Sequence, residues 1–567
     1  MAAAVLAVAV AVPFLLTGLG AVPFDDPGEG MHAQIAREML AGGRVLPLTL
    51  GGVPYVDKPP LLYALMAAAF SVSGPSEGAA RLVSALAALV AVGFTAWLGA
   101  RLGDARTGLV AGLALLASIG FFVYGRYVRP DALFVATLAV GFALALSGLV
   151  ERRPTRVVVG LAAFGLAALA KDPLGAVAPP LAIGLAMALA RCGRPVARWL
   201  PWPGVVVALG LAFGWWALAE AATPGYTWYT VVDNHVLNVA RARVFPDEDV
   251  PLSALEFATV GLLGAAPWVV PAAGMAARLA RDRAWRDPAE VPWIALALWG
   301  GGVFVLTALS PFRLPHYGLP AYPAIALLAA RGWRDLGVRW LAAAHAIILG
   351  VLALACGLAW ATDGAAFMTR VIGVSDVASR KSAVLAAAPP VPAWSAFQPL
   401  VGAAALVLGL GALALAIAAI ARARVVAVYA TLVTLCLLLP SAAVGLHLVS
   451  AHRAVAGLAA EVRRRAAVED VVAHEGPIEN AGALEWYSGR RPVIVDGRRS
   501  VLAFGATRPE GRDAFWDGRR LSEEWRGPGR VWLITGRPPQ LSVVAGLADA
   551  ELVAAGGGRR LYVNRVP

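Results

Sequence analysis

Residues 340–361 read WLAAAHAIILGVLALACGLAWA, and this stretch decides the fold class. It contains no charged side chain, and an α-helix of this length, rising about 1.5 Å per residue, spans the hydrocarbon core of a bilayer. Comparable runs recur along the 567-residue chain, which is 59% hydrophobic and only 15% charged, with a mean hydropathy of +0.70. Soluble proteins carry about 25% charged residues. We therefore expect a polytopic α-helical membrane protein.

About 13 apolar segments are expected to be transmembrane helices. We interpret the first as a membrane span rather than a cleaved signal peptide, because no basic residues precede it. The run at residues 60–73 is shorter and begins with proline, so we expect a re-entrant or interfacial helix there. The expected spans are residues 3–23, 80–100, 107–125, 131–150, 157–170, 173–190, 202–222, 255–277, 291–309, 314–330, 340–361, 399–421 and 425–447.

The loops between these segments fall into two alternating sets. One set is short and rich in arginine, whereas the long loops 24–79, 223–254 and 362–398 contain few basic residues. Arginine-rich loops stay on the cytoplasmic side of a membrane. The sequence therefore predicts a multi-pass protein of the bacterial inner membrane with a cytoplasmic N-terminus and periplasmic long loops. Because much of the net charge of +12 is loop arginine, we expect no nucleic-acid partner.

The composition changes after the last expected span. Residues 449–567 are more highly charged and contain two short apolar runs rich in β-branched residues, 492–495 and 531–535, which are typical of buried strands. We expect a membrane domain at residues 1–448 and a periplasmic α/β domain at residues 449–567. The three cysteines, Cys192, Cys356 and Cys436, are too far apart to indicate a zinc site or a disulfide framework.

Three carboxylates open the first long loop. Asp25, Asp26 and Glu29 directly follow the first expected span, so they lie near the outer membrane surface. Carboxylates there can take a proton from a nucleophile or bind a divalent metal. They can equally be solvated loop residues, with an aspartate capping the next helix. The residues alone leave both interpretations open.

Basic and aromatic residues also gather at the expected outer face. Lys58 lies in the segment Pro54–Pro60 and could bind a phosphate or extend to the membrane interface. A mixture of basic, aromatic and acidic groups suits an anionic lipid head group with a reaction centre beside it. The other outer connections contribute Arg126, Arg129, Asp131, Lys171, His235, Arg241, Arg243, Arg313, His316 and Tyr317.

Six short motifs together resemble a known family. The resemblance is to the aminoarabinose (ArnT-type) transferases and the protein O-mannosyltransferases, members of the GT-C superfamily of glycosyltransferases. It extends over essentially the whole chain and implies a GT-C type membrane fold with a periplasmic α/β domain. The motifs are Asp26-Pro27-Gly28-Glu29-Gly30 with Ala33–Leu40, Tyr55–Pro59, Arg129-Pro130-Asp131, Ala168–Pro173, Arg313–Pro320 and Trp486–Val493.

The resemblance implies an inverting sugar transfer at the outer membrane face. The donor would be a sugar on a polyprenyl (undecaprenyl) phosphate carrier, and the acceptor lipid A or another glycan, lipid or protein of the envelope. The implied partners are this donor, the acceptor and membrane lipids. No cofactor is clearly implied, and a divalent metal is left open. A nucleotide-sugar donor is not expected, because no glycine-rich phosphate loop opens a helix.

The resemblance also implies roles for particular residues. We expect Asp26 and Glu29 to act together in catalysis, with Asp25 as an alternative and Asp131 as a second acid. The candidates for binding the carrier phosphate are Tyr55, Lys58, Arg241, Arg243, Arg313 and Tyr317, and further site candidates are Asp57, Lys171, His235 and His316.

This chain departs from the family pattern at two positions. The family usually has Asp-Glu where this chain has Gly28-Glu29, so either a neighbouring carboxylate takes the role of the missing aspartate or the acceptor and mechanism differ. An arginine expected shortly after His235 is Asn238, for which Arg241 or Arg243 could substitute. Two other functions stay open: a transporter or flippase of lipid-linked sugars, and a structural module for envelope assembly. Neither is favoured, since no inverted repeat is evident and the second leaves the charged cluster unexplained.

Overall fold

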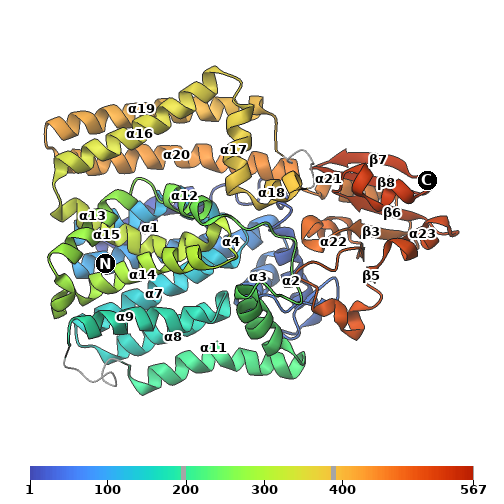
Figure 1. Cartoon of the computed structure of the whole chain (residues 1–567), viewed down its shortest axis with the longest axis horizontal. Coiled ribbons are helices and arrows are strands. Elements are labelled where there is room, and N and C mark those ends of the chain that lie inside the picture. Colours follow the sequence, from blue (N-terminus) through green and yellow to red (C-terminus); the bar gives the residue numbers. More distant parts are fainter. Residues whose placement is uncertain (193–199, 385–390, 566–567) are drawn as a thin grey trace.

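The long helices pack side by side in one part of the molecule, and a β-sheet lies at the other end (Figure 1). The computed structural model describes residues 1–192, 200–384 and 391–565. The short helices α2 (Gly30–Gly42), α3 (Leu61–Ser73), α17 (Ala365–Ser375) and α18 (Val377–Val384) lie between the two parts. The predicted helical membrane protein with a C-terminal sheet domain is confirmed.

Seven helical segments in the described part of the chain are long and apolar enough to cross a membrane. Their surfaces carry exposed apolar side chains such as Leu354 and Leu410, as expected for helices in contact with lipid. The segments are α4 (Glu77–Leu102), α7 (Pro130–Val150), α11 (Trp202–Ala222), α14 (Val291–Leu309) with the preceding turn, α16 (Val338–Ala361), α19 (Trp394–Ile420) and α20 (Arg424–Arg453) continuing into α21 (Ala456–Arg465).

Two bent helix pairs raise this number to nine if each pair forms one span. Helices α5 (Ala105–Leu116) and α6 (Ile119–Gly125) meet at 68°, and α12 (Ala254–Gly264) and α13 (Val269–Arg281) meet at 104°. The expected total of about 13 is not confirmed, because several expected spans form short helices. These are α1 (Ala2–Leu16), α8 (Pro154–Ala170), α9 (Leu174–Leu189) and the 3₁₀ segment η4 (Pro315–Ala321) with α15 (Tyr322–Asp335).

Local sequence signals set where several of these helices begin. Ser76 and Asp104 cap α4 and α5, since their side chains accept hydrogen bonds from the backbone N–H groups of Ala79 and Thr107. Helix α7 begins with Pro130, whose fixed φ suits the first helical position. Asp131 therefore lies in the first turn of α7, where the helix dipole favours a negative charge.

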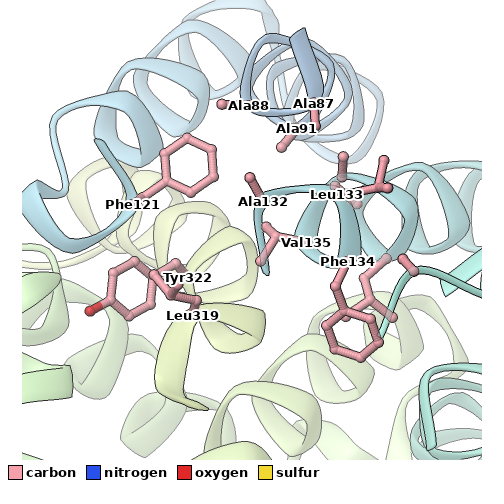
Figure 2. Packing of buried hydrophobic residues seen from close by; sticks show 14 of the residues in the cluster. Ala87, Ala88, Ala91, Phe121, Ala132, Leu133, Phe134, Val135, Leu319 and Tyr322 are labelled. Atoms are coloured by element: carbon pink, nitrogen blue, oxygen red, sulfur yellow. The ribbon is translucent and has the colours of Figure 1, made fainter. Parts of the chain in front are cut away.

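Small residues allow the membrane helices to pack closely. A Cβ atom at Gly108 of α5 would lie only 2.4 Å from the carbonyl oxygen of Ala96 in α4, so only glycine fits this contact. Figure 2 shows Phe121 of α6 between the alanines of α4 and Tyr322 of α15, next to Ala132 of α7. This packing fixes the end of α7 that carries Asp131.

The C-terminal domain contains a six-stranded mixed sheet in the order β5-β4-β3-β6-β8-β7. Strands β3, β4, β5 and β6 run parallel, and β8 is antiparallel to both β6 and β7. The two predicted strand segments are confirmed as β4 and β6. The strands are β3 (Val471–Glu475), β4 (Val493–Val495), β5 (Phe515–Trp516), β6 (Val531–Thr535), β7 (Glu551–Gly556) and β8 (Arg559–Val563).

The first long loop is docked on this C-terminal domain. The Asp26 carboxylate accepts hydrogen bonds from the backbone N–H groups of Val455 and Ala483, at 3.3 and 3.1 Å. Arg559 of β8 donates to the carbonyl oxygens of Asp26 and Asn480. Helix α20 runs through residue 448, where the sequence places the domain boundary, and ends at Arg453. The loop therefore connects the membrane helices to the C-terminal domain.

Candidate functional site

A cavity of about 1410 Å³ lies at the junction of the membrane helices and the C-terminal domain. One part of its wall is apolar and consists of side chains from α12 and α14, including Val260, Leu263, Val303 and Leu306. Leu263 and Leu306 are also more than half exposed, so this wall reaches the lipid-facing surface. The rest of the wall is rich in charged side chains. A ligand with an apolar tail and a charged head would fit both parts.

Ten of the site residues expected from the sequence line this cavity. The structure thus brings together groups from six separate stretches of the chain. The ten are Asp25, Tyr55, Asp57, Lys58, Asp131, Lys171, His235, Arg243, His316 and Tyr317. Asp26, Glu29, Arg241 and Arg313 are absent from its wall.

Lys171 and Asp131 form an ion pair on the cavity wall. Lys171 lies at the C-terminal end of α8, and its Nζ is 2.5 Å from Asp131 Oδ1. The same Nζ is 4.9 Å from the centre of the Tyr317 ring, within the range of a cation–π contact. Lys58 is paired in turn with its neighbour Asp57, at 2.6 Å, and its side chain is 30% exposed. Lys58 and Lys171 thus both line the cavity, although they lie more than 100 residues apart in the chain.

Arg129 differs from the other cations of the cavity. Its Nη1 donates to His316 Nδ1 at 3.1 Å, because a guanidinium can only donate. Within the described ranges, no ion pair joins Arg129 to a carboxylate, although it lines the cavity. Its remaining N–H groups are available for an anion. Arg129 belongs to one of the six sequence motifs. The sequence does not show, however, that its guanidinium lacks a carboxylate partner.

His235 and Arg243 belong to the second long loop and are held by hydrogen bonds. His235 lies in the π-helix η1 (Trp228–Leu237), and its Nε2 is 3.2 Å from Asp172 Oδ2. This contact with Asp172 raises the pKa of His235 above its usual value. Arg243 donates to Asn234 Oδ1 and forms ion pairs with Asp233 and Asp247, at 3.4 and 3.2 Å. Arg243 is therefore already occupied by protein groups.

Of the three carboxylates that open the first long loop, Asp25 is the one that lines the cavity. Its Oδ2 accepts hydrogen bonds from the Tyr127 hydroxyl at 2.6 Å and from Arg453 Nη2 at 2.7 Å. Its Oδ1 is buried and has no hydrogen-bond partner among the described residues. Burial raises the pKa of Asp25, opposed by Arg453 and Tyr127. Asp25 Oδ1 is thus available to accept a proton or a hydrogen bond from a ligand.

Gly28 occupies the position at which the family usually has an aspartate. Its φ is +145°, a conformation that L side chains rarely adopt, and a Cβ there would lie 2.4 Å from the Tyr127 hydroxyl oxygen. The Tyr127 hydroxyl, bonded to Asp25, therefore fills the space that a side chain at position 28 would need. The loop is built around glycine at this point.

Glu29 points away from the cavity. It is fully buried, and Arg81 donates to both of its carboxylate oxygens, at 2.9 and 2.6 Å. The backbone N–H groups of Val128 and Asp25 supply two more hydrogen bonds, each 3.0 Å long. Both carboxylate oxygens of Glu29 therefore accept two hydrogen bonds from the protein. Glu29 stabilises the loop and does not face a ligand.

Asp26 faces the C-terminal domain, where it accepts the two backbone hydrogen bonds described above. Burial raises the pKa of Asp26 to about 7, partly offset by Arg559 and these backbone donors. Arg241 is exposed at the surface, and Arg313 donates to the carbonyl oxygens of Leu252, Ala308 and Ser310. The structure does not bring Asp26, Arg241 or Arg313 to the cavity, although the sequence pointed to all three.

The cavity does not offer a site made for a metal ion. In the part of the chain that the structure describes, no three His, Cys, Asp or Glu side chains are arranged to hold one. Several of the carboxylates that line the cavity are paired with cations, as in Asp131–Lys171 and Asp25–Arg453. These residues do not fit a protein-bound divalent metal, so no step of the chemistry below uses one.

Comparisons with known proteins agree with this architecture. Residues 57–217 match the family described as dolichyl-phosphate-mannose-protein mannosyltransferase. ArnT from Cupriavidus metallidurans, solved bound to undecaprenyl phosphate, superposes with a TM-score of 0.79 at 23% sequence identity, covering 99% of this chain and 98% of ArnT. This chain has the ArnT fold. The resemblance predicted from the six motifs is confirmed.

Two curated relatives match over part of their length. An undecaprenyl phosphate-alpha-4-amino-4-deoxy-L-arabinose arabinosyl transferase of Aeromonas salmonicida is 27% identical over 332 residues, 57% of this chain and 58% of that protein. An uncharacterized protein of Aquifex aeolicus is 25% identical over 312 residues, 54% of this chain and 58% of its own length. The matched region thus covers less than two thirds of each relative. The ArnT fold itself, in contrast, extends over nearly the whole chain.

Proposed function

We propose that this protein is an inverting glycosyltransferase that moves a sugar from an undecaprenyl phosphate carrier to an acceptor on the periplasmic face of the bacterial inner membrane. The observation that carries the proposal is the two-part cavity, in which a lipid-facing apolar wall meets a cluster of cations. The ArnT structure bound to undecaprenyl phosphate supports it, because that protein shares this fold.

The two parts of the cavity wall would contact different parts of the donor. The polyprenyl tail would lie against α12 and α14, where Val260 and Leu306 line the cavity. The phosphate would lie at Arg129, Lys58 and Lys171, whose charges stabilise the leaving group as the sugar–phosphate bond breaks. We expect Arg129 to contribute most to phosphate binding, because the phosphate does not have to displace a carboxylate from it.

Asp25 is the residue placed to act on the acceptor. Asp25 Oδ1 would take the proton of the acceptor group while the acceptor oxygen attacks the anomeric carbon. The new carbon–oxygen bond forms as the bond from the anomeric carbon to the carrier phosphate breaks, and undecaprenyl phosphate leaves with the bonding electrons. This assignment gives Asp26 and Glu29 positioning roles, since each is bonded within the protein.

Replacing Arg129 tests the phosphate site. Arg129→Ala should weaken binding of undecaprenyl phosphate by about tenfold or more, because charge-assisted contacts contribute about 1.5–3 kcal/mol. Arg241→Ala is the matched control: Arg241 is exposed and does not line the cavity, so its loss should leave the affinity unchanged. Both affinities can be measured by displacement of a fluorescent polyprenyl phosphate from purified protein. Equal affinities in the two variants would remove Arg129 from the phosphate site.

The proposed orientation can be checked independently. We expect the C-terminal domain to be periplasmic, because the short arginine-rich loops favour the cytoplasmic side. Alkaline phosphatase fused after the last residue should therefore be active, whereas a fluorescent protein that folds only in the cytoplasm should stay dark. The reverse pattern would place the cavity on the cytoplasmic side and contradict the proposed reaction.

The reaction itself can be tested with purified protein. Defined undecaprenyl phosphate-linked pentoses and hexoses would be incubated with a membrane lipid extract, and products identified by mass spectrometry. We expect at least one sugar to appear on a membrane lipid or glycan, with release of undecaprenyl phosphate. Failure of the wild-type protein to bind undecaprenyl phosphate would contradict the proposed function.

A further inference from the structure

A second cavity, of about 540 Å³, lies at the other end of helix α14 from the cavity described above. Its wall includes Glu290, the residue before α14, whereas Ser310, the residue after α14, lines the first cavity. The 19 residues of α14 extend over about 28 Å, close to the thickness of the hydrocarbon core of a bilayer. The two cavities therefore lie near opposite faces of the membrane that α14 is long enough to cross.

The second cavity lies at the level expected for lipid head groups. Met275 and Leu279 of α13 contribute large apolar side chains to its wall, and both are buried. Trp340, at the start of α16, is 45% exposed and close to α13: a Cβ atom at Gly274 would lie 3.0 Å from the Trp340 ring. Tryptophan side chains are enriched where a membrane meets water. This arrangement indicates that the second cavity lies where acyl chains meet head groups.

The carboxylates on the wall of the second cavity are engaged within the protein. Arg331 of α15 donates to both carboxylate oxygens of Glu290, and its Nε lies 3.1 Å from Asp335 Oδ2. Asp287 accepts a hydrogen bond from the backbone N–H two residues later, at 2.9 Å. Asp282 forms ion pairs with two arginines at the end of α13. These carboxylates are thus committed to other groups.

Two arginines of the same wall have no such partners. The guanidinium groups of Arg283 and Arg286 form no hydrogen bond or ion pair in the described part of the chain. Arg283 precedes the 3₁₀ turn η2 (Ala284–Arg286) and Arg286 ends it, and both residues are exposed. Arg283 has a φ of +55°, in the left-handed region that favours glycine. A positive charge is therefore present at a position where glycine would be less strained.

We propose that the second cavity binds the phosphate of an anionic membrane lipid, and that Arg283 and Arg286 hold this phosphate. The site lies outside the proposed glycosyltransferase chemistry and does not depend on it. A guanidinium presents parallel N–H groups that match two phosphate oxygens, and arginines at a membrane surface attract anionic lipids. A lipid fits better than a free phosphate ion, because its glycerol and first acyl carbons can pack against Met275 and Leu279.

Arginine in a loop can also serve only to set the orientation of the protein in the membrane. Arg422 allows the two roles to be separated. It follows α19 with a φ of +52°, is exposed, and lies near the same end of the helices, since Arg424 donates to the carbonyl oxygen of Leu336 beside Asp335. It does not line the second cavity. Arg422 thus matches Arg283 in charge, exposure and backbone conformation, but not in its surroundings.

Photocrosslinking tests the lipid site directly. Purified protein would be placed in nanodiscs of phosphatidylcholine that contain a minor, subsaturating fraction of phosphatidylglycerol with a photoreactive group near its head. After irradiation and digestion, we expect mass spectrometry to find the cross-linked lipid on the segment 275–290. The label should persist in millimolar inorganic phosphate at constant ionic strength. Absence of label from this segment would overturn the proposal, and loss of the label in phosphate would overturn it in favour of a site for free phosphate.

Substitutions test the two arginines. Arg283→Gly should lower the labelling of this segment by about fivefold, the loss expected for one arginine near an anionic lipid surface, and Arg283→Gly with Arg286→Gln by about twentyfold. The thermal stability of Arg283→Gly should not fall, since its φ suits glycine, and its affinity for undecaprenyl phosphate should be unchanged. Arg422→Gly should be labelled as strongly as wild type. An equal loss in Arg422→Gly would show that only the general charge matters and would overturn the proposal, as would unchanged labelling in the double variant.

Discussion

Arg81→Met should lower the free energy of unfolding by about 3–5 kcal/mol, because it leaves the charge of Glu29 buried without its partner. Glu29 is fully buried, and Arg81 is also buried, with its Nη2 2.6 Å from Glu29 Oε2. Arg81 additionally donates to the carbonyl oxygens of Leu19, Val22 and Pro23 in the segment that follows α1. The loss can be measured by denaturant unfolding of the purified protein in detergent, followed by tryptophan fluorescence.

A more exposed ion pair provides the matched control for this prediction. Arg101 pairs with Glu151, but its side chain is 41% exposed, so Arg101→Met should cost only about 0–1 kcal/mol. The double substitution Arg81→Met with Glu29→Gln should recover part of the loss, because no uncompensated charge then remains. Equal destabilisation by Arg81→Met and Arg101→Met would show that the Glu29 pair is not buried as described.

The environment of Glu29 explains how this acid can affect sugar transfer without touching the substrate. Its two oxygens accept hydrogen bonds from the backbone N–H groups of Asp25 and Val128. Val128 precedes Arg129 directly, so Glu29 holds both the proposed base and the proposed phosphate ligand. Any loss of transfer in a Glu29 variant would therefore follow from displacement of Asp25 and Arg129.

The general architecture was predictable because it depends on composition over long stretches. Apolar runs of about 20 residues must form helices in lipid, where every backbone polar group needs an internal partner. Strand β6 was predictable for a similar reason. All five of its residues are buried, and a strand buried on both faces appears in the sequence as a continuous apolar run. The bends were not predictable from apolar length alone. The run at 255–277 looks continuous, yet residues 265–268 separate α12 from α13 at 104°.

The candidate site was only partly predictable, because sequence gives the residue types on a face but not the direction of each side chain. Asp25, Asp26 and Glu29 lie within five residues, yet they face the cavity, the C-terminal domain and Arg81 respectively. Glu479, which also lines the cavity, is more than 400 residues from them in the chain. Its segment carries no catalytic motif, and only the docking of the C-terminal domain brings it to the cavity.

Asp25→Asn should reduce sugar transfer by about 10²–10⁴-fold, the usual effect of removing a general base. An asparagine keeps the size of the side chain but cannot take the acceptor's proton. Binding of undecaprenyl phosphate should be retained, because Arg129, Lys58 and Lys171 are unchanged. Since burial raises the pKa of Asp25, the wild-type rate should fall with decreasing pH at a higher pH than the ordinary pKa of an aspartate near 3.8. This acidic limb should be lost in the residual activity of Asp25→Asn.

The loss in Asp25→Asn must be separated from loss of the ion pair with Arg453. Arg453 also pairs with Asp376 at 2.8 Å, so Asp376→Asn weakens the hold on Arg453 while leaving Asp25 in place. Tyr127→Phe removes the other hydrogen bond to Asp25 but keeps its carboxylate. We expect both variants to lose about tenfold or less, as for one hydrogen bond, and to retain the acidic limb. If Asp376→Asn lost as much activity as Asp25→Asn, the Arg453 ion pair rather than a base at Asp25 would account for the effect. Because Gly28 cannot supply a carboxylate and Glu29 is fully bonded, near-normal transfer by Asp25→Asn would contradict the proposed mechanism, in which Asp25 is the base.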